Sequence, residues 1–292
     1  MVSAPCLLAA AIHAGLVPVD LAGRGQIGVA STARSNPVHR IDAGGVPVAF
    51  VKQAGLAARL AGADPVAVES RVLGLLAGSG LVPALLPQRD PRTVWTRPAP
   101  GRPLLEAVSS VAALDAAARG LGGALARLHG LPVDAAPAAT VPWPLASRRP
   151  AWVGAVRTPG VAAVLDALGA EPLRSALAAA ASAWTPRGWV HGDVSALNVF
   201  VDGPRVTFID LEDAGLGHPD WDVVCALDTL AGLDPRPEAP AASVFLDAYG
   251  RPEPAPVWWT LRTVMTAWQL AAANPDEELS AHYLDRARAL AA

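Results

Sequence analysis

The residue pattern changes character at the segment PAPGRP, residues 98–103, and this change limits the chain to folds with two dissimilar parts. Before the segment, short β-type runs alternate with turn residues, whereas after it the apolar residues recur at helical spacing. A Pro- and Gly-rich stretch of this kind is typical of a linker. We therefore predict an α+β fold in two lobes, with a small antiparallel sheet and one helix in residues 1–97 and a larger, mainly helical lobe in residues 98–292.

The first part carries the signals of an antiparallel sheet. Gly44 and Gly45 separate two β-type runs, which indicates a hairpin. Asp64 followed by Pro65 marks the start of a helix that carries Glu69, because Asp is a good N-cap and Pro is favoured at the first helical position. We expect strands at 27–30, 38–41, 46–51, 81–83 and 93–96, and a helix from 65 to about 76.

The second part is predicted to be helical with one β-hairpin inside it. Residues 114–128 place four leucines on one helical face, and Gly130 ends that helix. Residues 198–201 and 205–209 are β-type runs joined by Asp202-Gly203, which predicts a hairpin. Further helices are expected within 151–184, from 257 onward, and over 277–290.

Composition excludes several classes of protein. With 52% hydrophobic and 17% charged residues the chain is globular and not disordered. No uncharged apolar window reaches the roughly 18 residues that a membrane span needs. The apolar run at residues 6–17 lacks a basic preceding region, so we interpret it as a short helix and not a secretory signal. Two cysteines, Cys6 and Cys225, offer neither a disulfide framework nor a metal site.

Charge is unevenly distributed along the chain. The first 210 residues hold 18 basic and 13 acidic side chains, whereas the remainder holds 5 basic and 13 acidic ones. A basic front half suits an anionic ligand, and an acidic back half suits a cationic one. The arginines are scattered and no zinc or RNP-type pattern occurs, so we expect no nucleic-acid partner. We expect a cytoplasmic protein with no membrane partner, and the sequence leaves the oligomeric state open.

Lys52 is the only lysine of the chain, and every other basic residue among the 23 Lys and Arg is arginine. An ammonium is a compact point charge on a flexible stem, whereas a guanidinium is a rigid planar fork. A lone lysine at the end of a predicted strand therefore suggests a pocket too narrow for arginine. The alternative is an accident of composition.

Residues 188–222 (GWVHGDVSALNVFVDGPRVTFIDLEDAGLGHPDWD) gather the polar side chains that phosphoryl transfer needs. Asp193 and Asn198 precede the first strand of the predicted hairpin, and Asp210 follows the second. One carboxylate can orient and deprotonate an acceptor hydroxyl, while an amide and a second carboxylate can hold Mg²⁺ on the phosphates of a nucleotide. The D-x-x-x-x-N spacing lets one loop serve both substrates.

These motifs resemble the aminoglycoside phosphotransferase and choline kinase family, whose fold is similar to that of protein kinases. The resemblance covers most of the chain and rests on Lys, Glu, HGD-x4-N and ID in this order and at these spacings. It includes Ser35-Asn36-Pro37 with Arg40, Lys52, Glu69, Leu128-His129, His191-Gly192-Asp193, Asn198, Ile209-Asp210, and Gly217 with Pro219 and Asp222.

The resemblance implies a role for each site residue. Lys52 is expected to contact the α- and β-phosphates and to pair with Glu69, and Ser35 with its backbone to cover the phosphates. Asp193 is expected to be the base or acceptor-orienting group, with Asn198 and Asp210 as the magnesium ligands. The chain departs from the family pattern at Ala33-Arg34, where glycine is frequent, and at residues 195–197, which weakens any inference about nucleotide preference and acceptor.

The leading interpretation is a phosphotransferase that uses ATP (GTP possible) and Mg²⁺ to phosphorylate a hydroxyl of a small-molecule acceptor, aminoglycoside-like or another metabolite. The acidic back half gives weak support for a cationic acceptor. One alternative is a kinase of Ser or Thr in a natural-product precursor peptide, and another is a nucleotide-binding pseudokinase. Retention of Lys52, Asp193, Asn198 and Asp210 together argues against the pseudokinase.

Several nearby residues are expected to support the site structurally. We expect His191 to fix the loop by hydrogen bonds, His129 to be a helix-end or packing histidine, and Asp222 to brace the catalytic loop. Glu212 and Asp213 are interpreted as solvated carboxylates, although they closely follow the expected metal ligand Asp210. Three tryptophans belong either to the core or to a wall of the acceptor pocket: Trp258, Trp259 and Trp268.

Overall fold

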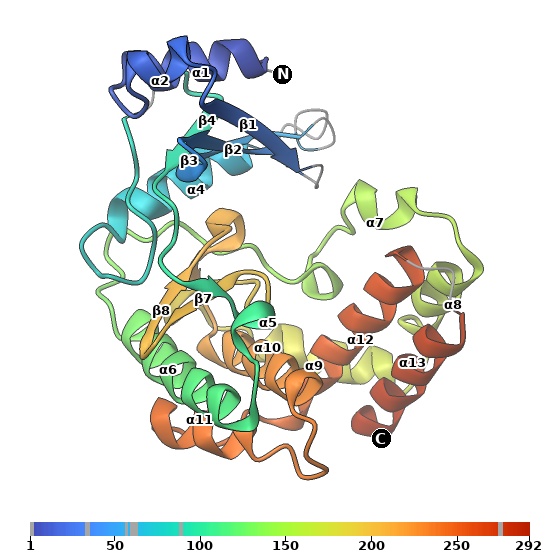
Figure 1. The fold of residues 1–292 in the computed structure, drawn as a ribbon. Helices are drawn as coiled ribbons and strands as arrows, with labels where there is room; N and C mark the ends of the chain where they lie inside the picture. Colours follow the sequence, from blue (N-terminus) through green and yellow to red (C-terminus); the bar gives the residue numbers. More distant parts are fainter. Residues whose placement is uncertain (1–2, 33–35, 56–57, 59–63, 88–89, 274–276) are drawn as a thin grey trace. The chain divides into compact units, whose positions relative to one another are not determined.

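The computed structural model describes residues 3–32, 36–55, 58, 64–87, 90–273 and 277–292, and the chain divides into two compact units (Figure 1). The first consists of Met1–Ala107 and Leu197–Asp213, and the second of Val108–Ala196 and Ala214–Ala292. The first holds an antiparallel sheet and the second is mainly helical, which confirms the predicted α+β fold. That nucleotide binding belongs to residues 1–97 and acceptor binding to 98–292 stays a prediction.

The first unit is built on a four-stranded antiparallel sheet in the order β1-β2-β3-β4. Gly44 and Gly45 form the predicted turn between β2 and β3 at φ values of 59° and 79°, which glycine adopts without a steric penalty. The strands are β1 (Ile27–Thr32), β2 (Val38–Ala43), β3 (Val46–Gln53) and β4 (Thr93–Thr96).

Helices pack around this sheet. Helix α1 (Ala4–His13) is followed by α2 (Val19–Gly23), and α1 buries Leu7 and Ala11 against a core that includes Ile41 and Val51 of the sheet (Figure 1). Helix α4 (Pro65–Leu75) begins as predicted, because the Asp64 side chain accepts a hydrogen bond of 2.9 Å from the backbone N–H of Ala67. This cap fixes the start of the helix that carries Glu69.

The predicted catalytic hairpin forms, but it belongs to the first unit and not to the helical one. Strand β7 (Val199–Asp202) pairs with β8 (Arg205–Phe208) on one side and with the short β5 (Arg102–Pro103) on the other, and β5 leads into α5 (Leu104–Ala107). The last two residues of the segment expected to be a linker are therefore held in a sheet. At Gly101, φ is 82° and an added Cβ would lie 2.0 Å from the carbonyl oxygen of Val201, so only glycine fits there.

The strand expected at residues 81–83 does not form. Instead, the backbone N–H of Phe208 donates a 2.7 Å hydrogen bond to the carbonyl oxygen of Leu81, which gives this stretch a partner in the hairpin. A short apolar run does not by itself distinguish a strand from a buried irregular segment.

The second unit contains most of the helices. It comprises α6 (Val111–His129), the 3-10 turn η1 (Trp143–Leu145), α7 (Ala151–Ala155), α8 (Pro159–Ala167), α9 (Leu173–Ala183), α10 (Pro219–Leu233), α11 (Ala241–Tyr249), α12 (Pro256–Ala273), α13 (Glu277–Ala291) and a two-stranded sheet of β6 (Gly188–Val190) with β9 (Gly215–Gly217).

Two groups of helices form this unit in Figure 1. Helix α6 packs closely on α11. At Gly122 of α6, an added Cβ would lie only 2.4 Å from the carbonyl oxygen of Phe245 on α11, so the close approach needs glycine there. Helix α12 packs against α8, α9 and α13 around a core that includes Val264 and Trp268. The sequence predicted α6, α12 and α13.

Helix α10 was not expected from the sequence. Seven consecutive residues, 221–227, are buried, so the helix has no polar face and lacks the 3.6-residue alternation that marks a surface helix. Its position is important because it carries Asp222, Cys225 and Asp228.

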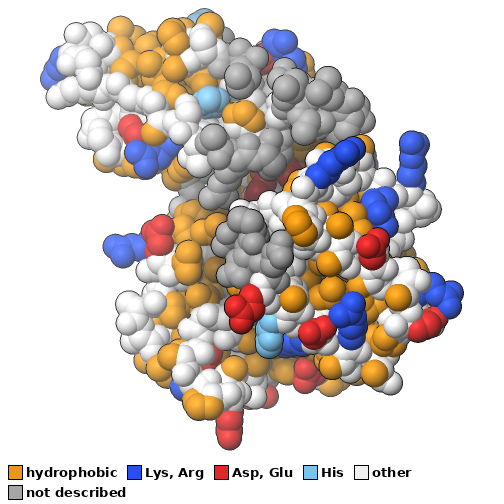
Figure 2. Space-filling model, turned by 90° about the vertical axis from the view of Figure 1, so that its right-hand side faces the viewer, with side chains coloured by type: hydrophobic (Ala, Val, Ile, Leu, Met, Phe, Trp, Pro, Cys, Tyr) orange, Lys and Arg blue, Asp and Glu red, His pale blue; other side chains and the backbone are white. Residues whose placement is uncertain are grey.

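The surface shows no separation of charge on the face drawn in Figure 2, where basic and acidic side chains are interspersed among apolar ones. This agrees with the scattered arginines of the sequence. Within the described residues, no helix is long and apolar enough to cross a membrane.

Candidate active site

Lys52 lies at the centre of a cluster of acidic side chains in the first unit. Its ammonium nitrogen lies 2.9 Å from Oε2 of Glu69 on α4 and 2.7 Å from Oε2 of Glu212, and it also contacts Oδ1 of Asp210. Lys52 is only 8% exposed and Glu69 only 6%. The structure therefore contains the Lys52–Glu69 ion pair that the resemblance implies.

Strand β3 and the short turn η2 (Leu211–Asp213) bring this cluster together. Lys52 pairs with Val38 of β2 and Val94 of β4, so its backbone is fixed on both sides within the sheet. Glu212 lies on η2, directly after the hairpin. Residues from three separate parts of the sequence thus meet at one ammonium.

The cluster holds more negative than positive charge. Burial by itself lowers the pKa of Lys52, but the attraction of Glu69, Asp210 and Glu212 outweighs it and the pKa is raised, so the side chain stays protonated. Burial raises the pKa of Glu69 and that of Glu212, and the nearby charge of Asp210 adds to both effects. A further cation would relieve this excess of negative charge.

Asp210 has an unusual backbone conformation. Its φ of 64° lies in the left-handed region, which is uncommon for a residue other than glycine, and its side chain is 33% exposed. Strained positions of this kind are often found at functional sites. The conformation follows strand β8 directly and ends the hairpin.

Asn198 and Asp210 are hard oxygen donors of the kind that Mg²⁺ prefers. The backbone N–H of Ile209 donates a 3.0 Å hydrogen bond to the carbonyl oxygen of Asn198, so the residue before Asp210 is tied to Asn198 across the hairpin. Among the described residues, no group of three or more His, Cys, Asp or Glu side chains could hold a metal alone. The pair still fits Mg²⁺, since this ion commonly takes one or two protein ligands and completes its shell with water and phosphates.

Glu212 and Asn36 also belong to this cluster, although no task at the site was predicted for either of them. The Asn36 side-chain nitrogen donates a 2.6 Å hydrogen bond to Oε2 of Glu212, while its oxygen accepts one of 2.8 Å from the backbone N–H of Gly55. Glu212 is 24% exposed and contacts Lys52, so its interpretation as a solvated carboxylate is wrong. Its position two residues after the expected metal ligand Asp210 was the available signal.

A second polar cluster lies in the second unit, against the backbone of the HGD motif (residues 191–193). Oδ2 of Asp222 accepts a 2.6 Å hydrogen bond from the backbone N–H of His191, and Oδ1 accepts one of 2.9 Å from that of Gly192. The indole N–H of Trp221 donates to the carbonyl oxygen of Gly192 at 2.8 Å. Asp222 and His191 are each 0% exposed. Asp222 braces the loop, as predicted.

This brace extends to α6 and α11. Nε2 of His129 lies 3.1 Å from Oδ2 of Asp222, and its Nδ1 lies 2.7 Å from the hydroxyl of Tyr249. Nδ1 of His191 accepts a 3.1 Å hydrogen bond from the backbone N–H of Asp193, so His191 orients this loop. Both histidines therefore have the structural roles that the sequence predicted.

The structure locates most of the predicted site residues. Lys52, Glu69 and Asp210 meet in the first unit, with Asn198 on the same hairpin, and Asp193 follows the braced loop of the second unit. Ser35 and the neighbouring Ala33-Arg34 lie outside the described residues.

Two of the three tryptophans considered for an acceptor wall belong to the core. Trp258 is 2% exposed and its ring centroid lies 4.4 Å from that of His218. Trp268 is 8% exposed and packs edge-on against Trp143. The core interpretation holds for both.

Comparison with solved structures supports the fold. The chain is similar to aminoglycoside phosphotransferase APH(3'')-Id from Streptomyces rimosus, with 22% identity, coverage of 92% of this chain and 97% of that chain, and a TM-score of 0.57. It is similar to a choline/ethanolamine kinase family protein from Mesorhizobium loti, with 20% identity, coverage of 90% and 87%, and a TM-score of 0.55. It is also similar to the GDP and kanamycin complex of APH(2")-IIia, with 18% identity, coverage of 90% of this chain and 93% of that chain, and a TM-score of 0.59.

Comparison of the sequence itself gives the family. A search of curated proteins finds no match. The sequence profile of the phosphotransferase enzyme family matches residues 33–260, which is well over half of the chain and includes every residue of the two polar clusters. The chain therefore belongs to the phosphotransferase enzyme family, whose members transfer phosphate to hydroxyl groups.

Proposed function

We propose that this phosphotransferase moves the γ-phosphate of ATP, or of GTP, to a hydroxyl of a small molecule, with Mg²⁺ held by Asn198 and Asp210. The observation that carries the proposal is the buried Lys52 ammonium in contact with Glu69, Asp210 and Glu212. An ammonium held by several carboxylates can bind phosphate oxygens and retain its place beside a metal ion.

Each of the proposed site residues has a defined task in phosphate transfer. Lys52 donates to the α- and β-phosphates, and Glu69 and Glu212 hold its ammonium in place. When bound, Mg²⁺ would neutralise the charge of the phosphates. Ser35 and the backbone around it are proposed to cover the phosphates.

Asp193 is proposed to act on the acceptor. The acceptor oxygen forms a bond to the γ-phosphorus, the bond from that phosphorus to the bridging oxygen of the β-phosphate breaks, and the hydroxyl proton passes to Asp193. The brace from Asp222 to the backbone of His191 and Gly192 fixes the start of the loop that carries this carboxylate.

The fold neighbours support a small-molecule acceptor. One is a complex with GDP and kanamycin, and another aminoglycoside phosphotransferase, at 16% identity, is a ternary complex with ADP and hygromycin B. A precursor peptide as acceptor stays an alternative, because the proposed Lys52, Asn198 and Asp210 roles are the same for both.

Calorimetry with ATP and with GTP, each with and without Mg²⁺, tests the nucleotide part of the proposal. We expect binding that tightens when Mg²⁺ is added, and we expect Asn198→Ala to lose this gain. Asp202→Asn, at the exposed turn of the same hairpin, is the matched control and should keep it. Failure of both nucleotides to bind under any of these conditions would contradict the proposal.

A further inference from the structure

Arg262 is a mostly buried cation of the second unit whose hydrogen-bonding capacity is only partly used. It lies on α12, its side chain is 13% exposed, and its Nε donates a 2.8 Å hydrogen bond to Oδ2 of Asp228 on α10. A guanidinium has five N–H donors. Within the part of the chain that the structure describes, the two terminal nitrogens of Arg262 donate no hydrogen bond.

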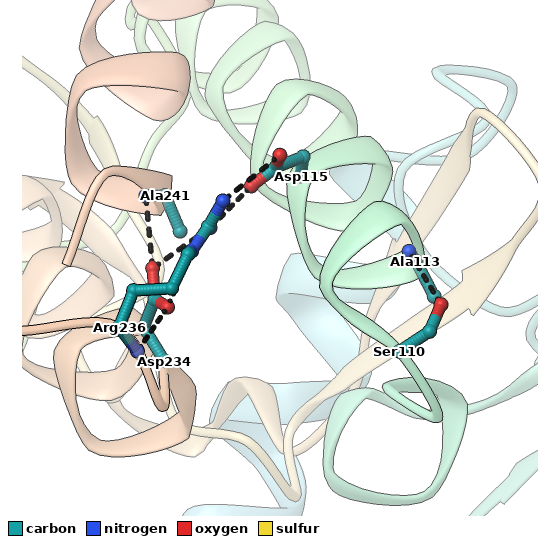
Figure 3. A network of polar contacts seen from close by, with 6 residues as sticks. All are labelled: Ser110, Ala113, Asp115, Asp234, Arg236 and Ala241. Carbon is teal, nitrogen blue, oxygen red and sulfur yellow. Dashed lines mark hydrogen bonds and ion pairs between the residues drawn. The ribbon is translucent and has the colours of Figure 1, made fainter.

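Arg236 of the same unit is a guanidinium whose three nitrogens all have partners (Figure 3). Its Nε and Nη2 donate to Asp234, and Nη1 and Nη2 donate to the two oxygens of Asp115 at 3.2 and 2.6 Å. Asp234 also accepts from the backbone N–H of Ala241. All three nitrogens of Arg236 are engaged within the protein, so this network ties α6 to the segment between α10 and α11.

Arg262 lies close to the residue proposed to act on the acceptor. The charges of Asp193 and Arg262 are near enough to interact. The Thr229 hydroxyl of α10 donates a 3.5 Å hydrogen bond to the carbonyl oxygen of Val194, the residue after Asp193, and the Cys225 thiol of α10 is within electrostatic range of both charges. The loop that follows Asp193 is thus attached to α10, the helix whose Asp228 accepts the hydrogen bond from Arg262.

A partly buried guanidinium with free donors is a binding group for an oxyanion, because a carboxylate or phosphate can accept two parallel N–H bonds from it. Asp228 accepts the hydrogen bond from Nε of Arg262 and leaves the two terminal nitrogens of that side chain for a ligand. Arg262 would repel a cationic group of an acceptor placed at the same point. The excess of acidic over basic side chains in residues 211–292 is spread over that whole segment and does not determine the local charge at Arg262.

We propose that Arg262 determines acceptor specificity by binding a carboxylate of the acceptor, so that the substrate is a small hydroxy acid whose hydroxyl reaches Asp193. The proposal rests on the proposed phosphotransfer to a small molecule and names its substrate class. Arg262 then contributes to acceptor binding, and Asp193 to the transfer.

The test is ADP release from Mg²⁺ and ATP in the presence of three sets of small hydroxyl compounds. The first contains the hydroxy acids glycerate, 3-hydroxybutyrate and shikimate, the second the neutral glycerol and 1,3-butanediol, and the third the cationic ethanolamine, choline and kanamycin. We expect stimulation by a member of the first set. For that compound, Arg262→Gln should lower kcat/KM by about 10- to 100-fold, mainly through KM, since a charged hydrogen bond is lost.

Two variants separate this role from a structural one. Arg262→Lys keeps the cation and should retain part of the acceptor affinity, while Arg236→Gln should lower the melting temperature and leave kcat/KM unchanged. Calorimetric ATP binding should be the same in all variants that fold, and its absence in the wild type would contradict the proposed function itself. Stimulation only by neutral or cationic compounds, no stimulation despite bound ATP, or an unchanged kcat/KM in Arg262→Gln would overturn the hydroxy-acid proposal.

Discussion

The two polar clusters differ in how completely their charges are satisfied. Around Lys52 of the first unit, three carboxylates share one ammonium, and burial raises the pKa of Glu69 and Glu212. Asp222 of the second unit instead accepts hydrogen bonds from two backbone N–H groups and lies beside His129. The first arrangement has an unmet need for positive charge and suits a ligand, whereas the second is complete and suits a brace.

The same distinction separates the two arginines of the second unit. Among the residues that the structure describes, Arg236 finds partners for all its nitrogens, whereas Arg262 finds a partner for one. Counting the partners of a buried charge therefore distinguishes groups that hold the fold from groups that are available for binding.

Asp193→Asn should lower the rate of phosphate transfer by a factor of about 10² to 10⁴, because the side chain is proposed to take the acceptor proton. The affinity for the nucleotide should stay nearly intact. Single-turnover transfer and calorimetric ATP binding, measured on the same preparation, check this. An equal loss of both would show that Asp193 holds the nucleotide or the fold instead.

Lys52→Arg should fold with nearly normal stability and lose about 100-fold in turnover, since the planar guanidinium cannot occupy the same point among three carboxylates and a shift of about 1 Å displaces the phosphates. A melting curve beside an ATP-consumption assay provides the measurement. Arg24→Lys, at an exposed position after α2, is the control for exchanging one basic side chain for the other. Wild-type turnover in Lys52→Arg would mean that the lone lysine is an accident of composition.

Asp222→Asn should mainly reduce stability. One oxygen becomes an NH₂ group that faces a backbone donor, and an unsatisfied buried group costs about 1–3 kcal/mol, which corresponds to a fall in melting temperature of several degrees. Asp220→Asn on the same helix is the control, because Asp220 is 26% exposed and its ion pairs are long, at 3.6 Å from Arg187 and 4.0 Å from His218. A melting temperature unaffected by Asp222→Asn would contradict the role of this carboxylate as a brace.

The smallest effect concerns pH and His218, which caps α10 by accepting a hydrogen bond from the backbone N–H of Asp220. Burial, and then the charge of Arg187, lower the pKa of His218 below its ordinary value of 6.5. The unfolded chain therefore binds the proton more readily. The contribution of neutral His218 to stability is fully present above pH 6.5 and is lost as the pH falls below that value.

Thermal melts between pH 8 and pH 5 check this expectation. His218→Asn keeps a capping group without a titrating ring, so the wild type should lose more stability than the variant over this range. Identical pH dependence of the two proteins would contradict it.

The sequence by itself determined most of the local structure. The Gly44-Gly45 turn, the Asp64 cap, the long helix ending at Gly130 and the hairpin after Asn198 are all properties of short stretches, and each formed as predicted. The order and spacing of the motifs also identified Lys52 and its partner Glu69, because each lies at a predictable position on a strand or helix that short stretches of sequence indicate. The family followed from the same motifs.

Only the tertiary structure decided which distant residues meet. Lys52 and Asp210 are 158 positions apart, and Asn36 and Glu212 are 176 apart, so no periodicity in the sequence connects them. The pairing of residues 102–103 with β7 placed the hairpin of β7 and β8 in the first unit. The free donors of Arg262 likewise depend on which helices pack around it. Hydrogen bonds and charge pairs between distant segments are made by packing, and local residue patterns do not encode them.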